Sequence, residues 1–184
     1  MKVLVCFSGQ IGSGKSSVST SVAKVLGWKR TGFGDYLRAE IKRKGGDPTK
    51  REALQDLGQF LVDTDADAFC RSVLNAGGFK PGDNFIVDGV RHVDILRRLK
   101  DIAAPSATRL IFLGTDEEIR QKRVAARHDK NDYSRSTKHR VEAELVHELP
   151  SVADVVIDAT HSFDDVVAQC LTNIEVWQRT VSRP

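Results

Sequence analysis

The sequence predicts a three-layer α/β/α fold around a five-stranded parallel sheet. Short apolar runs alternate with segments of helical periodicity along nearly the whole chain, the pattern typical of βα units. A glycine-rich loop separates the first apolar run from the first helical segment. The length of 184 residues fits one domain, and no apolar run approaches the roughly 20 residues that a membrane-spanning helix needs.

Five short segments, four of them mainly apolar, are expected to form the strands. They comprise residues 3–7, 28–33, 84–88, 110–113 and 155–157. Each has the length of a strand and is bounded by polar residues, glycines or a helical pattern. Strands that alternate with helices pair in parallel, and the helices then cover both faces of the sheet.

The helices are expected where apolar residues recur at three- and four-residue spacing. These segments are residues 18–26, 35–76 with a break at 45–48, 93–99, 115–127, a segment that ends near 149–150, and a closing helix after residue 162. Thr49 and Ser162 are expected to cap the helices that follow them. Thr115 and Glu118 have the spacing of a capping box.

The glycine-rich loop is a complete phosphate-binding motif. Residues 9–16, GQIGSGKS, match G-x-x-x-x-G-K-[ST] between a predicted strand and a predicted helix. Glycines let backbone N–H groups converge on a polyphosphate, and the helix N-terminus adds the positive end of its dipole. We therefore expect an ATP and Mg²⁺ site formed by Gly9, Gly12, Ser13, Gly14, Lys15, Ser16 and Ser17. In it Lys15 contacts the β- and γ-phosphates, and the Ser16 hydroxyl binds Mg²⁺.

An acid and an arginine follow the third predicted strand. Asp88 ends that strand, so it is expected at the carboxyl edge of the sheet, where it can hold a water of the Mg²⁺ ion. The alternative is an ordinary Asp-Gly turn. Arg91 is expected to bind a substrate phosphate, because a guanidinium contacts phosphate with two hydrogen bonds. Its alternative is a surface arginine.

Asp35 and Arg38 follow the second predicted strand and lie one helical turn apart, so they share a helix face. They could be a surface ion pair worth only a few tenths of a kcal/mol. The functional interpretation makes Arg38 a clamp for an acceptor phosphate. Asp35 is then either the partner that orients Arg38 or a general base.

A basic segment follows the fourth strand. Between residues 120 and 140 eight Lys and Arg residues accompany only two acids. We expect residues 128–140 to be a lid that closes over nucleotide and supplies cations while excluding water. The alternatives are an idle basic surface or an RNA contact, but Tyr133 is the one aromatic residue there, which makes RNA a weak interpretation.

The rest of the composition narrows the class of protein. A net charge of +3 gives no argument for nucleic-acid binding. The three cysteines are widely spaced and expected to be reduced, which indicates a cytosolic protein. The histidines and cysteines lack the spacing of zinc ligands. Residues 129–132 resemble a guanine-reading motif, but the first position is wrong and no strand precedes it.

With these residues in place, the chain resembles the P-loop nucleoside monophosphate kinases, the adenylate-kinase-like group. The resemblance rests on the N-terminal phosphate loop, on residues 34–39 (GDYLRA), on residues 88–91 (DGVR) and on residues 123–127 (RVAAR). It implies a P-loop NTPase fold in which Arg38 and Arg91 hold the acceptor while Arg123 and Arg127 bind the donor, Arg127 acting on its phosphates. Spacing adds Arg135, expected on the acceptor, and Arg140 as lid arginines.

The chain departs from the adenylate kinases proper. No proline precedes Arg91, and the lid is short and without cysteines. In these respects it is similar to phage-type deoxynucleoside monophosphate kinases and to dephospho-CoA-kinase-like ATPases, which carry a helical insertion like residues 51–58. The resemblance therefore implies phosphoryl transfer to a nucleoside or deoxynucleoside monophosphate, and the departures concern the acceptor rather than the reaction class.

The expected organisation is one kinase domain. Its core comprises residues 1–34, 83–127 and 141–184, with a helical acceptor-binding insertion at 35–82 and the lid at 128–140. Small-molecule nucleotides are the expected partners. The rival functions are a hydroxyl kinase such as a dephospho-CoA kinase, and an ATPase switch that acts on protein or RNA. Candidates to read the acceptor base are Gln55, Gln59, Asp63 and Asp65, and residues 159–161 are candidates to contact the donor adenine.

Overall fold

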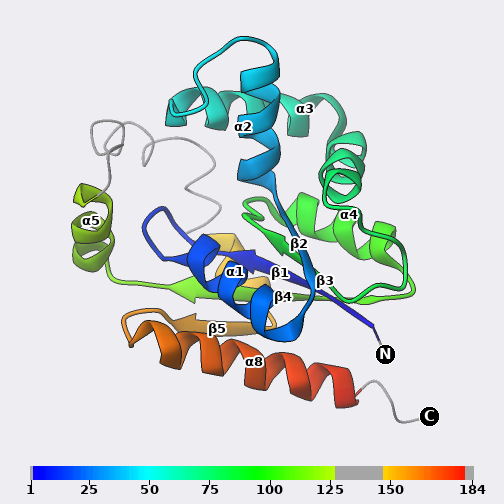
Figure 1. The fold of residues 1–184 in the computed structure, drawn as a ribbon, viewed down its shortest axis with the longest axis vertical. Coiled ribbons are helices and arrows are strands. Elements are labelled where there is room, and N and C mark those ends of the chain that lie inside the picture. The colour runs from blue at the N-terminus through cyan, green and yellow to red at the C-terminus, as the bar shows by residue number, and fades with distance from the viewer. Residues whose placement is uncertain (1, 127–146, 181–184) are drawn as a thin grey trace.

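The computed structural model describes residues 2–126 and 147–180. Its sheet has five parallel strands in the order β2-β3-β1-β4-β5, which confirms the predicted fold class (Figure 1). The strands are β1 (Val3–Ser8), β2 (Lys29–Gly32), β3 (Phe85–Asp88), β4 (Ala107–Gly114) and β5 (Val155–Asp158). In this register Asp88 is opposite Phe7 of β1 and Gly32 of β2, so three strands end together at this acid.

Helices cover both faces of the sheet. They are α1 (Lys15–Leu26), α2 (Phe33–Arg43), α3 (Arg51–Ala76), α4 (Val93–Ala103), α5 (Glu117–Ala125) and α8 (Phe163–Thr180), and residues 147–152 are also helical. The side chains of β1 alternate between two cores. Leu4 and Cys6 join the core beneath α3 and α4, while Val3, Val5 and Phe7 join the core beneath α1 and α8. Burial on both faces explains why residues 3–7 of this strand are all apolar.

The helix ends differ from several sequence expectations. Thr49 does not cap α3: its N–H and hydroxyl both donate to Asp47 Oδ1, and Lys50 is the N-cap residue. Thr115 does not form the capping box either, because α5 begins one residue later with Asp116 as its N-cap. The cap at Ser162 is confirmed, since its Oγ accepts a hydrogen bond from the Asp165 N–H at 3.2 Å.

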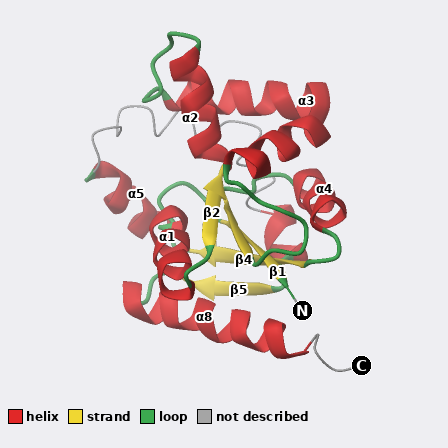
Figure 2. Cartoon of the chain, turned by 45° about the vertical axis from the view of Figure 1, so that its right-hand side comes forward, coloured by secondary structure: helices red, strands yellow, loops and turns green. Residues whose placement is uncertain are grey.

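The long helix α3 is interrupted once. Asp65 has the non-helical angles φ −160° and ψ 88°, and its Oδ1 accepts a hydrogen bond from the Ala68 N–H at 2.8 Å. This is the geometry of an N-cap, so a new helical segment starts at the break. Phe69, Cys70 and Val73 of the second segment are buried in the core. The first segment extends with α2 beyond the carboxyl edge of the sheet (Figure 2).

In the part of the chain that the structure describes, no helix combines the length and the apolar character needed to cross a membrane.

Candidate active site

A cavity of about 480 Å³ opens at the carboxyl edge of the sheet, between the glycine-rich loop and the helices α2 and α3. This volume is within the range of small-molecule sites. Its walls include Gly12, Gly14, Lys15, Ser16, Ser17, Asp35, Arg38, Asp88 and Arg91, all of them predicted site residues. The structure thus brings predicted site residues from three separate segments of the sequence into one cavity.

The glycine-rich loop has the backbone that phosphate binding requires. Gly12 and Gly14 both have φ +86°, a conformation that side chains disfavour. Gly14 is the N-cap of α1, and no side chain caps this helix, whose first turn is described in full. No side chain therefore accepts a hydrogen bond from the N–H groups at the start of α1. These N–H groups lie at the cavity, where they can donate to a bound anion. Lys15 begins the helix and donates a long hydrogen bond of 3.4 Å to the Gln10 carbonyl.

The residues around Asp88 fit a magnesium ion. Its side chain is only 7% exposed, and Oδ2 accepts a hydrogen bond from Arg30 Nη2 at 2.6 Å. The other oxygen, Oδ1, is buried and has no hydrogen-bond partner among the described residues. Because a buried carboxylate oxygen without a partner is costly, a ligand that supplies a cation or a water would stabilise it. Ser16 lies in the same cavity wall, as the phosphate-loop motif requires.

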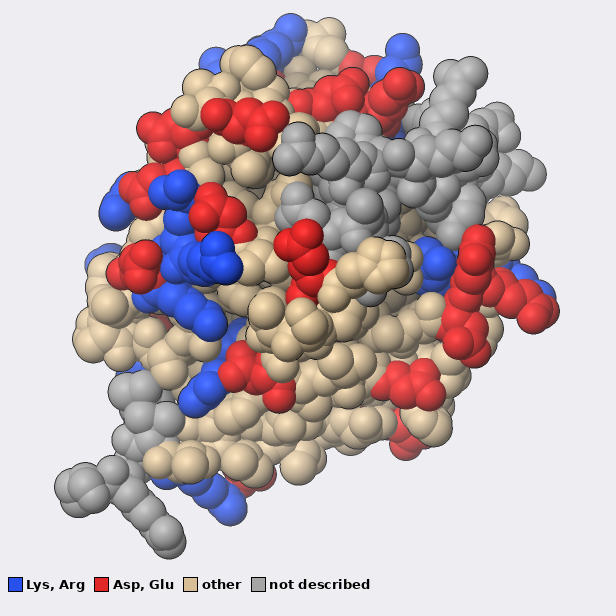
Figure 3. Space-filling view, turned by 180° about the vertical axis from the view of Figure 1, so that it is seen from behind, with Lys and Arg blue, Asp and Glu red and all other residues tan. Residues whose placement is uncertain are grey.

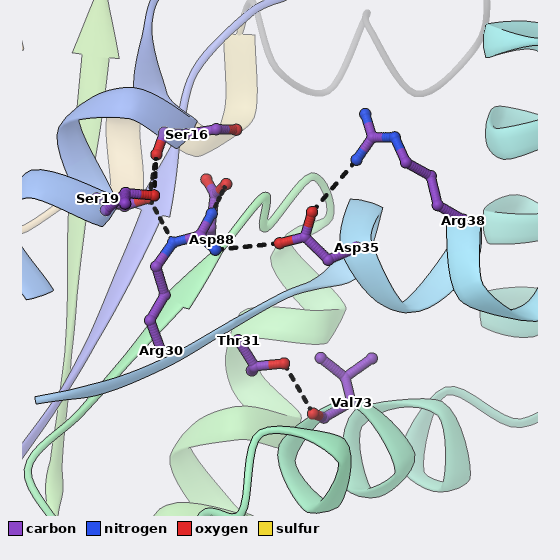
Figure 4. Close-up of polar contacts among 9 residues, drawn as sticks. Ser16, Ser19, Arg30, Thr31, Asp35, Arg38, Val73 and Asp88 are labelled. Atoms are coloured by element: carbon purple, nitrogen blue, oxygen red, sulfur yellow. Dashed lines mark hydrogen bonds and ion pairs between the residues drawn. The ribbon is translucent and has the colours of Figure 1, made fainter. Parts of the chain in front are cut away.

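Arg30 is a site residue that the sequence analysis missed. It projects from β2, and its Nε donates to Ser19 Oγ at 2.9 Å, its Nη1 to Asp35 Oδ2 at 3.0 Å, and its Nη2 to Asp88 Oδ2 (Figure 4). The available signal was a charged residue inside a short strand. The role of this residue depends on the pairing of β2 with β3, which cannot be inferred from the sequence around Arg30.

Asp35 and Arg38 lie on one face of α2 and form an ion pair. Arg38 Nη1 lies 3.4 Å from Asp35 Oδ1, and both side chains are at least half exposed. Asp35 is in the first turn of α2, where the helix dipole favours a negative charge. Asp35 therefore bridges two guanidinium groups, that of Arg30 on one oxygen and that of Arg38 on the other. Arg91 lines the same cavity from the loop that follows β3.

The candidates for reading an acceptor base divide into two groups. Gln55 and Gln59 line the cavity from the first segment of α3. Asp63 and Asp65 are not among its lining residues. Asp63 accepts a hydrogen bond from Gln59 Nε2 at 2.9 Å, and Asp65 caps the second segment of α3.

Arg123 lies between the phosphate loop and the loop that follows β5. Its Nη2 donates to the Ala159 carbonyl at 2.8 Å and its Nη1 to the Ser13 carbonyl at 3.5 Å. It thus contacts both the phosphate loop and Ala159, which belongs to the segment 159–161 expected on the donor side. Arg127, Arg135, Arg140 and the predicted lid at 128–140 lie outside the described residues.

Away from the cavity, the charged side chains are mixed in sign. On the face seen from behind in Figure 3, Lys and Arg lie among Asp and Glu. Elsewhere on the surface, helical ion pairs such as Arg71–Asp67 and Arg98–Asp94 also join charges of opposite sign. The described residues on this face therefore form no broad basic tract of the kind that nucleic-acid backbones attract.

Comparisons with known proteins agree with this architecture. A family model described as an AAA domain (AAA_17) matches residues 8–142. A UPF0200 protein from Methanothrix thermoacetophila is 31% identical over 129 residues, 70% of this chain and 68% of the relative. An adenylate kinase from Synechococcus sp. (strain WH7803) is 26% identical over 146 residues, 77% of this chain and 78% of the relative.

Solved kinase structures share the fold at low identity. A shikimate kinase from Bacteroides thetaiotaomicron superposes with a TM-score of 0.59 at 11% identity, covering 94% of this chain and 98% of that one. A gluconokinase from Sinorhizobium meliloti 1021 gives a TM-score of 0.57 at 17% identity, covering 98% and 94%. The chain therefore belongs to the AAA-domain family AAA_17 and to the UPF0200 proteins, and it adopts the P-loop kinase fold.

Proposed function

We propose that the protein transfers the γ-phosphoryl group of MgATP to a nucleoside or deoxynucleoside monophosphate, giving the diphosphate and ADP. One observation carries the proposal. A single cavity is lined both by the phosphate loop and by the two arginines Arg38 and Arg91. Two phosphate-binding groups in one cavity are what a donor and an acceptor nucleotide require for phosphoryl transfer.

On the donor side, the N–H groups of the loop and Lys15 hold the polyphosphate. Ser16 and Asp88 would hold the magnesium ion, which neutralises charge on the phosphate oxygens when it is bound. Arg123 joins the donor side through its contacts with Ser13 and Ala159. Arg127 is proposed to contact the donor phosphates, and Arg135 the acceptor.

On the acceptor side, Arg38 and Arg91 would orient the monophosphate so that one of its oxygens attacks the γ-phosphorus in line with the departing ADP oxygen. A phosphate monoester carries negative charge near neutral pH, so the attacking oxygen needs no general base. Catalysis then depends on positioning and on charge stabilisation. Asp35, held between Arg30 and Arg38, serves in this scheme to orient Arg38.

The direct test is ADP release from MgATP with each ribo- and deoxynucleoside monophosphate, and dephospho-CoA, offered singly. Strong stimulation by one monophosphate is the expected result and would identify the acceptor. A slow release that no acceptor changes would contradict the proposal and favour an ATPase that a protein or RNA partner regulates.

Removing either of the two proposed acceptor-binding arginines is expected to weaken the binding of the acceptor. Arg38→Ala and Arg91→Ala should each raise the KM for the monophosphate about 10- to 100-fold, the effect of losing hydrogen bonds to a charged group. The KM for ATP should change little. Arg43→Ala is the matched control, because Arg43 lies in the last turn of α2 and pairs with Glu40 at the surface. An equal rise in both KM values would contradict the assignment of Arg38 and Arg91 to the acceptor.

Asp35→Asn separates the proposal from a kinase that acts on a hydroxyl group. The presence of a carboxylate in the cavity wall favours this second candidate. If the acceptor is a phosphate, the Asp35→Asn variant should retain activity within about tenfold of the wild type, because only the orientation of Arg38 is disturbed. A hydroxyl acceptor needs a base, which is typically worth 10²- to 10⁴-fold, so its loss should be far larger. Steady-state kinetics with the acceptor found above decide between the two.

A further inference from the structure

Arg30 connects three elements of the site through one guanidinium group. It hydrogen-bonds Ser19 of α1, Asp35 of α2 and Asp88 of β3, at distances between 2.6 and 3.0 Å (Figure 4). Ser19 Oγ in turn donates to the Ser16 carbonyl at 3.1 Å. Arg30 therefore touches Asp88 directly and reaches Ser16 through one side chain, and these are the two residues proposed for the magnesium ion.

The same arginine separates two carboxylates. Gly32 shows how near they lie: a Cβ atom built on it would be 2.7 Å from Asp35 Oδ2 and 3.5 Å from the Asp88 Cβ. Asp35 Oδ2 and Asp88 Oδ2 are also the two oxygens that bind Arg30. Two acids this close repel each other unless a positive charge lies between them. The Arg30 side chain, only 18% exposed, supplies that charge.

Without this guanidinium, Asp35 and Asp88 would offer two oxygens to any divalent cation, because hard cations prefer carboxylate ligands. A cation between these acids would lie against Asp88 Oδ2, the oxygen that now binds Arg30. The buried oxygen Oδ1, which has no partner among the described residues, would still lack one. Arg30 thus lies between Asp35 Oδ2 and Asp88 Oδ2, where a bound cation would not reach Asp88 Oδ1.

We propose that Arg30 is a positioning residue with two separable tasks, an inference that rests on the proposed function. Its charge prevents the Asp35–Asp88 pair from collecting a divalent cation in the absence of nucleotide. Its three hydrogen bonds hold Asp88 with Oδ1 turned to the metal of MgATP, and Asp35 against Arg38. The first task needs only a positive charge, whereas the second needs the planar fork of an arginine.

Two substitutions separate the tasks. Arg30→Gln removes the charge, and Arg30→Lys keeps it while losing the three-way bonding. Binding of Mn²⁺ to the nucleotide-free protein, followed by the electron paramagnetic resonance signal of free Mn²⁺, measures the first task. Steady-state kinetics measure the second. The control is Arg43→Gln, which removes one arginine from a surface ion pair outside the cavity.

Arg30→Gln is expected to bind Mn²⁺ about tenfold more tightly than the wild type, the direction that removing a nearby positive charge dictates. Arg30→Lys and Arg43→Gln should bind it as the wild type does. The double variant Arg30→Gln/Asp88→Asn should return to wild-type affinity. The kcat of both Arg30 variants should fall at least about tenfold, since both lose the hydrogen bonds that position Asp88 and Asp35.

A general disruption of the fold would weaken metal binding, so tighter binding distinguishes this role from a structural one. Unchanged or weaker Mn²⁺ binding by Arg30→Gln would overturn the first task, and an unchanged kcat in Arg30→Lys would overturn the second. Should Arg30→Gln fail to fold, as a thermal melt would show, Arg30→Lys still tests the positioning. The Mn²⁺ titration uses no acceptor, so it can succeed even if no monophosphate is phosphorylated. A failure of the proposed role of Arg30 is therefore distinguishable from a failure of the proposed function.

Discussion

Lys15→Ala is expected to lower kcat by at least about 100-fold, on the scale of losing one donor to transition-state charge. Lys15 begins α1 and lies in the cavity wall, where its ammonium group can contact the β- and γ-phosphates. In this structure its Nζ makes a long hydrogen bond of 3.4 Å to the Gln10 carbonyl. Charge-assisted hydrogen bonds to phosphate oxygens are shorter and stronger than this contact with a neutral carbonyl.

The measurement is kcat for ADP formation with the acceptor found in the panel. Lys24→Ala is the control, because Lys24 is an exposed lysine in the last turn of the same helix. It should change kcat by less than about twofold, as surface substitutions usually do. Turnover of Lys15→Ala near the wild-type value would contradict the assignment of the loop to ATP.

Gly12→Ala is expected to abolish ATP binding and to lower stability by about 2–4 kcal/mol. Its φ of +86° costs a side-chain-bearing residue about 1–2 kcal/mol. In addition, a Cβ atom at this position would lie 2.8 Å from the Arg120 carbonyl oxygen and 3.1 Å from the Arg120 Cα. Both are backbone atoms, so either the loop or the start of α5 has to move.

Gly27→Ala separates the cost of a positive φ from the cost of a steric clash. Gly27 also has a positive φ, +65°, but a Cβ atom built there meets nothing within 4 Å. It should therefore lose only the conformational cost of about 1–2 kcal/mol and bind ATP normally. Thermal denaturation together with ATP titration distinguishes the two variants. Equal melting temperatures and equal ATP affinity for both would contradict the close approach of Gly12 to α5.

Features that depend on local pattern were predictable from the sequence. The phosphate loop and the strand that precedes it are contiguous, so one motif in its context was enough to place them. Asp88 at a strand end and the helical spacing of Asp35 and Arg38 are equally local. The structure brings all of them to one cavity because parallel strands end at the same edge of the sheet.

Features that depend on tertiary neighbours were not predictable. Arg30 acquires its role only because β2 pairs with β3, so that its side chain reaches an acid 58 residues further along the chain. The capping pattern at Thr115 failed because short polar patterns fit several registers, and α5 begins one residue later. The break at Asp65 is hidden by helical periodicity on both sides of it.

That break has a consequence for how the protein can change. Before Asp65, the α3 residues Gln55 and Gln59 line the cavity. After it, Cys70 and Val73 are buried in the core, and Phe69 belongs to the core while also lining the cavity. Because Asp65 caps the second segment with its own side chain, that segment starts without help from the first. Substitutions in the first segment can thus change part of the cavity wall, while the buried residues of the second segment keep their packing in the core.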